Sequence, residues 1–166
     1  CLIQQITRLL SKVLPSVLIV SKNNSVYSFL KSPQITLKED LSTQGYPLGG
    51  IYSGLMFCQT EKAFICACDM PFIHPKLISA LIQASSGTSA VIPVWHGIRQ
   101  PLCGVYSKSA LRAMGGMIQN GSKSLVELFE IIPTRFFSEE EVKAIDPEGR
   151  SFLDIDTPED FQKVQG

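Results

Sequence analysis

The stretch Ala63-Phe64-Ile65-Cys66-Ala67-Cys68-Asp69-Met70-Pro71 decides the fold of this chain. Its first six residues form an uninterrupted apolar run, which is typical of a strand covered by helices on both faces of a sheet. The run stops at an acidic residue followed by Met-Pro, a combination that favours a turn. A helix is predicted to begin near Pro75, because proline is favoured at the first helical position. The stretch therefore predicts a strand, a loop and a helix in succession.

The same alternation extends in both directions along the chain. Further strands are predicted at 17–20, 35–37, 90–94 and 102–106, and extended segments at 134–137 and 152–155. Helices are predicted at 2–14, from Pro47, at 110–119, at 125–131 and from Thr157, where Thr-Pro-Glu-Asp has the pattern of a helix start. Strands that alternate with helices of these lengths predict a mostly parallel sheet covered on both faces. No linker or repeat interrupts the pattern, so we predict a single α/β domain over residues 1–166.

Composition excludes several classes of partner. Lys plus Arg and Asp plus Glu both number 15, so no basic excess favours nucleic acid or a membrane surface. No apolar run approaches the roughly 20 residues that cross a bilayer, and polar residues interrupt the leading segment, unlike a signal peptide. Cys66, Cys68 and Cys103 lie in apolar runs, so we expect reduced, buried thiols in a cytoplasmic protein. Cys66 and Cys68 are too close in sequence for a zinc pair, and no second pair accompanies them.

Three loops are candidates for chemistry, because ligands of open α/β sheets bind beyond the carboxyl ends of strands. These loops are 21–24, 39–50 and 69–72. A carboxylate directly after an apolar strand is costly unless it is solvated, hydrogen-bonded or bound to a cation. Asp69 therefore fits a Mg²⁺ ligand, since Mg²⁺ takes one or two carboxylates together with phosphates and water. Capping of the Met70-Pro71 turn is an equal alternative.

Weaker signals accompany Asp69. A carboxylate such as Asp40 suits the paired N–H donors of a guanine edge, although a solvated loop acid is the simpler interpretation. Gly49-Gly50 leaves backbone N–H groups free to meet an anion at a helix N-terminus, yet glycine pairs open many helices without a ligand. Arg99 flanks a predicted turn between two strands, where it either lines a pocket or faces solvent.

Taken together, these segments resemble the molybdenum cofactor guanylyltransferase family. The matching stretches occur in family order and span nearly the whole chain. They are Pro47-Leu48-Gly49-Gly50-Ile51 with Gly54-Leu55, Cys68-Asp69-Met70-Pro71-Phe72, Arg99-Gln100-Pro101-Leu102 with Gly104-Val105-Tyr106, and Phe152-Leu153-Asp154-Ile155-Asp156-Thr157-Pro158-Glu159-Asp160.

The resemblance implies a three-layer Rossmann-like nucleotidyltransferase with a mostly parallel sheet. It implies an enzyme that transfers GMP from GTP to molybdopterin-bound molybdenum and releases pyrophosphate, with other molybdenum cofactor biosynthesis proteins as partners. Carried over, Asp69 is the catalytic Mg²⁺ ligand, and the nucleotide-binding residues are Asn23, Asp40, Leu48, Gly49 and Asp69. Arg99, Asp154 and Asp156 are expected on the substrate side.

The chain also departs from the family pattern. Tyr46 stands where the family usually has Gly, and Asp154 and Asp156 stand where Asn is common. No segment of the family's N-terminal type, a strand followed by a Leu-Ala-Gly-Gly phosphate loop, occurs in this sequence, so we expect that segment to be missing from it. Two alternatives therefore accompany the guanylyltransferase interpretation. One is a non-catalytic homologue that binds a nucleotide or a partner, and the other is a nucleotidyltransferase that uses CTP or a sugar phosphate.

Overall fold

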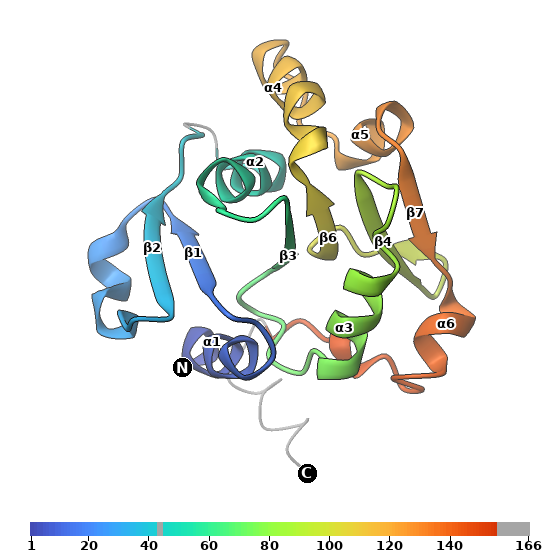
Figure 1. Ribbon diagram of the computed structural model, residues 1–166, viewed down its shortest axis with the longest axis horizontal. Coiled ribbons are helices and arrows are strands. Elements are labelled where there is room, and N and C mark those ends of the chain that lie inside the picture. Colours follow the sequence, from blue (N-terminus) through green and yellow to red (C-terminus); the bar gives the residue numbers. More distant parts are fainter. Residues whose placement is uncertain (43–44, 156–166) are drawn as a thin grey trace.

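The computed structural model describes residues 1–42 and 45–155 (Figure 1). Its α-helices are α1 (Leu2–Val13), α2 (Pro47–Phe57), α3 (Pro75–Gln83), α4 (Leu111–Gln119), α5 (Leu125–Ile131) and α6 (Glu139–Lys143). Its strands are β1 (Val17–Ser21), β2 (Ile35–Glu39), β3 (Lys62–Cys66), β4 (Ala90–Trp95), β5 (Ile98–Arg99), β6 (Cys103–Ser107) and β7 (Thr134–Phe137). Short 3₁₀ turns are η1 (Asn24–Leu30), η2 (Lys108–Ala110) and η3 (Arg150–Phe152).

The strands form two groups rather than one continuous sheet. β1 and β2 pair in parallel, with Val17 opposite Ile35. The larger group has the order β3-β6-β4-β5, and β7 pairs in parallel with β4. β6 runs antiparallel to both β3 and β4, and β5 folds back on β4 as a hairpin. The expectation of a mostly parallel sheet is therefore corrected for the larger group, because β6 is reversed between its neighbours.

The helices cover the strands on two faces, which gives the three layers expected from the sequence (Figure 1). Successive residues of a strand point to opposite faces, and β4 follows this rule. Val91 packs with α1 and α3 in one apolar cluster, whereas Ala90 and Ile92 pack with α2, α4 and α5 in the other. Both faces of β4 are thus buried, as its continuous apolar run predicts.

Short-range signals set the helix starts. Pro47 and Pro75 occupy the first turns of α2 and α3, and the Ser138 side chain forms a capping box with Glu141 at the start of α6. The His74 side chain accepts a hydrogen bond from the Lys76 amide and caps α3. Such caps fix where each helix begins and hence where the preceding loop must end.

Some boundaries differ from the sequence predictions. In the segment expected to be extended at 152–155, Phe152 is instead the last residue of η3, whereas Leu153 after it has an extended backbone. The predicted helix from Thr157 and the residue Asp156 lie outside the described residues. Within the described ranges, no helix is both long and apolar enough to cross a membrane.

α2 is the element that connects the two groups of strands. It packs against both β1 and β3 and also against α4, and Figure 1 shows it between β1 and β6. Leu48, Ile51 and Leu55 anchor it, since each is at most 1% exposed. The N-terminal turn of α2 is therefore held rigidly beside the loop that leaves β2.

Candidate functional site

Asp69 lies in the turn that follows β3. Its Oδ1 atom is buried and receives no hydrogen bond from any described residue. The backbone carbonyl of Asp69 accepts a hydrogen bond from the Ile155 amide at 3.0 Å, so the segment after η3 is fastened to this turn. A buried carboxylate oxygen without a donor costs roughly 1–3 kcal/mol or more. The geometry fits a cation, whereas the capping alternative requires an N–H donor that the described residues do not supply to Oδ1.

The cysteines around Asp69 differ in burial, since Cys103 is buried, Cys66 is half-buried and Cys68 is exposed. Burial raises the pKa of the Cys66 thiol to about 12, and the neighbouring Cys68 and Asp69 contribute in the same direction. Burial also raises the pKa of Cys103, which lies opposite Cys66 in the β3–β6 ladder. All five cysteines are free thiols. The expectation that Cys68 is buried is wrong, because β3 ends at Cys66 and places Cys68 in the exposed turn.

Asp40 belongs to a second cluster, at the end of β2. Its amide donates to the Ser21 carbonyl at 2.9 Å and so extends the β1–β2 ladder by one bond. Its Oδ1 atom accepts from the Ser42 amide at 2.9 Å and from the Ser53 hydroxyl at 2.7 Å. No described residue donates to Oδ2. Asp40 is therefore an oriented carboxylate with one oxygen available, not a freely solvated loop acid.

The glycine turn packs against this loop. A Cβ on Gly49 would lie 2.3 Å from Ser42 Oγ, so only glycine fits there, whereas a Cβ on Gly50 would meet nothing within 4 Å. Ser42 Oγ is itself buried and lacks a partner among the described residues. Lys22 reaches the same loop, since its Nζ would lie 2.5 Å from a Cβ on Gly45. The loop after β2 and the start of α2 are thus packed closely together, and the Lys22 ammonium group lies beside the loop.

Two other predicted nucleotide-binding residues have structural partners of their own. Asn23 Oδ1 accepts hydrogen bonds from the Ser25 amide at 3.1 Å and the Ser25 hydroxyl at 2.6 Å, and so caps η1. The Leu48 side chain is 1% exposed and belongs to the apolar core. Any contact of Leu48 with a ligand is therefore restricted to its backbone, and Asn23 retains only its amide nitrogen for one.

Of the residues expected on the substrate side, the structure describes Arg99 and Asp154, and the two lie in different surroundings. The Arg99 guanidinium lies 4.3 Å from the Phe136 ring centroid and 3.6 Å from Glu130 Oε1, so its described contacts are with β7 and α5. Asp154 is exposed and adjoins Ile155, whose amide binds the Asp69 carbonyl. No hydrogen bond between described residues joins the Asp69 turn to the Asp40 cluster. The fold therefore presents two separate carboxylate positions, and α2 packs against β1 and β3.

Three residues that the sequence did not single out individually contact Asp40, the loop that follows it or the residue before α2. They are Lys22, Ser53 and Lys123. The Lys123 ammonium donates to the Tyr46 hydroxyl, and its Nζ lies 4.0 Å from the Tyr46 ring centroid. Tyr46 immediately precedes α2, so this contact ties the α4–α5 loop to the glycine turn. The only sequence signal for this contact between Lys123 and Tyr46 was the tyrosine itself, which stands where the family usually has glycine.

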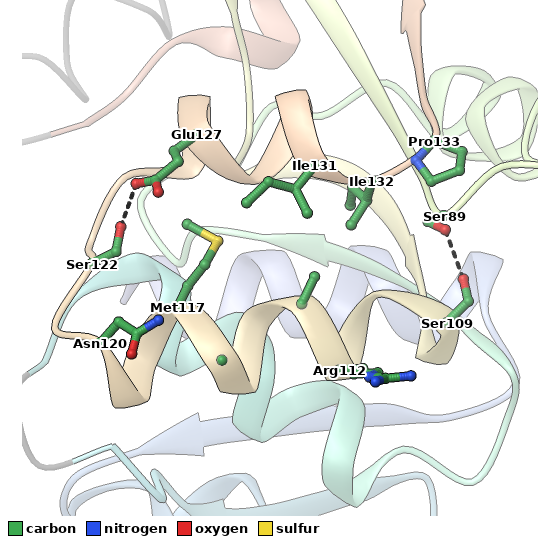
Figure 2. Close-up of a pocket in the computed structure, with 12 residues that line it drawn as sticks. Ser89, Ser109, Arg112, Met117, Asn120, Ser122, Glu127, Ile131, Ile132 and Pro133 are labelled. Carbon is green, nitrogen blue, oxygen red and sulfur yellow. Dashed lines mark hydrogen bonds between the residues drawn. The ribbon is translucent and has the colours of Figure 1, made fainter.

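A separate groove lies between α4 and α5 (Figure 2). Ser122 and Glu127 are hydrogen-bonded at one end of it, and Ser89 and Ser109 at the other. Its lining includes Arg112 but none of the candidate nucleotide or metal residues. The groove is thus distinct from the positions that the sequence singled out.

Comparison with known proteins agrees with the resemblance seen in the sequence. The MobA-like NTP transferase domain model matches residues 1–135. A probable molybdenum cofactor guanylyltransferase of Methanosarcina mazei is 33% identical over 171 residues, which cover 99% of this chain and 76% of that protein. A similarly named protein of Chloroflexus aggregans is 32% identical over 168 residues, which cover 99% of this chain and 79% of that protein.

Solved structures show the same relationship at the level of the fold. Molybdopterin-guanine dinucleotide biosynthesis protein A from Archaeoglobus fulgidus has a TM-score of 0.80 at 25% identity, covering 98% of this chain and 83% of that one. 2-C-methyl-D-erythritol 4-phosphate cytidylyltransferase from Thermus thermophilus has a TM-score of 0.72 at 13% identity, covering 99% and 86% of the two chains, and shares the fold alone. The expected Rossmann-like nucleotidyltransferase fold is confirmed.

Proposed function

The chain belongs to the MobA-like NTP transferase domain family, and from this premise we propose that it is a molybdenum cofactor guanylyltransferase. In the proposed reaction the terminal phosphate of molybdopterin attacks the α-phosphorus of GTP. The bond between the α- and β-phosphates breaks, GMP is joined to the pterin, and pyrophosphate leaves. The observation that carries the proposal is the match over 99% of the chain to a relative named for this activity.

Asp69 is the residue that we assign to the metal. Its buried Oδ1 without a described partner fits Mg²⁺, which accepts a single carboxylate when phosphates and water complete its coordination. No group of three or more His, Cys, Asp or Glu side chains that could hold a metal occurs in the described part of the chain, so a site made wholly of protein ligands is not proposed. When bound, Mg²⁺ would offset the negative charge of the phosphates.

Asp40 is the residue that we assign to the guanine base. Guanine presents two N–H donors side by side, and an ionised carboxylate is an acceptor-only group that matches them. Cytosine lacks this pair of donors, so a fixed carboxylate favours GTP over CTP. Oδ2 of Asp40 remains available because Oδ1 is occupied by Ser42 and Ser53. Asn23, Gly49 and the backbone of Leu48 complete the proposed nucleotide contacts.

The remaining contributions concern the second substrate. We assign Asp154 and Asp156 to the pterin side, where the segment after η3 is fastened to the Asp69 turn. Arg99 is a weaker candidate, because Glu130 and Phe136 already engage it. A cytoplasmic location and transfer of the product to other molybdenum cofactor biosynthesis proteins follow as parts of the same proposal.

Nucleotide-dependent thermal stabilisation tests this function. A ligand at about 100 times its Kd stabilises a protein by roughly 2.7 kcal/mol. We expect GTP with Mg²⁺ to raise the melting temperature of the full-length protein and CTP with Mg²⁺ to leave it unchanged. Equal shifts with the two nucleotides would contradict the guanine assignment, and no shift with either would favour a homologue without nucleotide transfer.

A further inference from the structure

Ser53 joins three groups that the proposed nucleotide site depends on. It lies within α2 and is fully buried. Its hydroxyl oxygen lies 2.7 Å from Asp40 Oδ1, 2.9 Å from the Gly49 carbonyl oxygen and 3.0 Å from the Leu41 amide nitrogen. These partners come from both the loop after β2 and the glycine turn. A single side chain therefore connects the two segments.

The hydrogen-bonding capacity of a serine explains this arrangement. A hydroxyl has one proton to donate and accepts with its lone pairs. The Leu41 amide donates to it, and the proton is directed to Asp40, the shorter and charge-assisted contact. The Ser42 amide adds a second donor to the same Asp40 oxygen. Both donors hold Oδ1, so Oδ2 is the oxygen left for a ligand.

We propose that Ser53 is a positioning residue for base recognition, which holds the Asp40 carboxylate so that Oδ2 meets the N–H donors of guanine. The inference rests on the proposed function, because Asp40 must first be the residue that recognises the base. Ser53 itself is buried under the loop and acts only through its neighbours. Because the single hydroxyl proton is directed to Asp40, the Gly49 carbonyl, four residues earlier in α2, is only a neighbour of this hydroxyl.

An ordinary helical serine does not have this set of partners. Ser79 in α3 makes the same type of contact to a carbonyl four residues earlier, that of Pro75 at 3.4 Å, but it is exposed and has no described loop partner. Ser79→Ala is therefore a matched control for Ser53→Ala. Both changes remove one helical hydroxyl, and only one of them disconnects Asp40.

The test compares GTP with inosine triphosphate, which lacks the exocyclic amino group of guanine, in the full-length protein with Mg²⁺. We expect the wild type to bind GTP more tightly than inosine triphosphate. Ser53→Ala should weaken GTP binding roughly tenfold, the loss typical of a hydrogen bond to a charged group, and bring the ratio of the two affinities towards one. Ser79→Ala should leave the ratio unchanged. In an Asp40→Asn background, Ser53→Ala should cause little further loss.

The possible failures are distinguishable. If the wild type prefers GTP to CTP but Ser53→Ala keeps the wild-type ratio of GTP to inosine triphosphate, Ser53 has no positioning role and the proposed function stands. If the wild type binds no nucleotide, both proposals are overturned. Hydrogen exchange of the Leu41 amide gives a readout without nucleotide. It should accelerate in Ser53→Ala and not in Ser79→Ala, and unchanged exchange would show that the loop is held by other contacts.

Discussion

Replacing Asp69 by asparagine separates its proposed role from a structural one. The substitution keeps the shape of the side chain and removes the charge from a buried oxygen that has no described donor. Because such a group costs roughly 1–3 kcal/mol, we expect Asp69→Asn without metal to be as stable as the wild type or about 1 kcal/mol more stable. For a chain of this size, 1 kcal/mol corresponds to roughly 2–4 °C in melting temperature.

Although Asp69→Asn should not destabilise the protein without metal, it should reduce the stabilisation that GTP and Mg²⁺ provide. With Mg²⁺ and GTP at about 100 times the Kd, the wild type gains roughly 2.7 kcal/mol, whereas Asp69→Asn should gain far less and should release no pyrophosphate. Thermal unfolding with and without GTP, together with a pyrophosphate assay, measures both effects. A variant that kept full turnover and full stabilisation by GTP would show that Asp69 only shapes the turn after β3.

Three further predictions concern the surroundings of the site. Gly49→Ala should weaken GTP binding and lower stability by roughly 1–3 kcal/mol, because its Cβ would collide with Ser42; Gly50→Ala, with open space around its Cβ, should do neither, and titration calorimetry with chemical unfolding compares the pair. The free energy of unfolding should fall as the pH rises from 9 towards 12, because burial raises the pKa of Cys66 to about 12 and the folded state then holds a proton that the unfolded state has lost. Cys66→Ala should reduce this slope by up to roughly 1.4 kcal/mol per pH unit in urea unfolding series, and an unchanged slope would refute the assignment. Lys123→Ala should change stability by no more than about 0.5–1 kcal/mol, since the contact is exposed, and a larger loss in thermal unfolding would mean that the α4–α5 loop supports the core.

The sequence identified the elements whose signals are local. The apolar run before Asp69 predicted β3, and prolines at first helical positions located the starts of α2 and α3. The direction of β6 could not be predicted in this way, because an apolar strand has the same pattern whichever way it runs. The burial of Cys68 was misjudged because β3 ends at Cys66, and strand ends depend on ladder partners distant in sequence.

The sequence predicted the acidic residues of the candidate site, but it did not predict which side chains surround them. Asp40 and Asp69 were singled out by their positions after strands, whereas Ser53 looked like any helical serine until the fold placed Asp40 beside it. Arg99 was expected near substrate, but its contacts with Glu130 and Phe136 depend on α5 and β7 packing against the hairpin. Interactions of this kind join residues far apart in the chain, and periodicity carries no information about them.

The most direct test of the central claim is to identify the product by mass spectrometry. The full-length protein is incubated with molybdopterin cofactor, Mg²⁺ and an equimolar mixture of GTP and CTP. We predict a pterin dinucleotide that carries GMP, with one pyrophosphate released for each product formed. A product that carries CMP in equal or greater amount, or nucleotide binding without any dinucleotide product, would contradict the account.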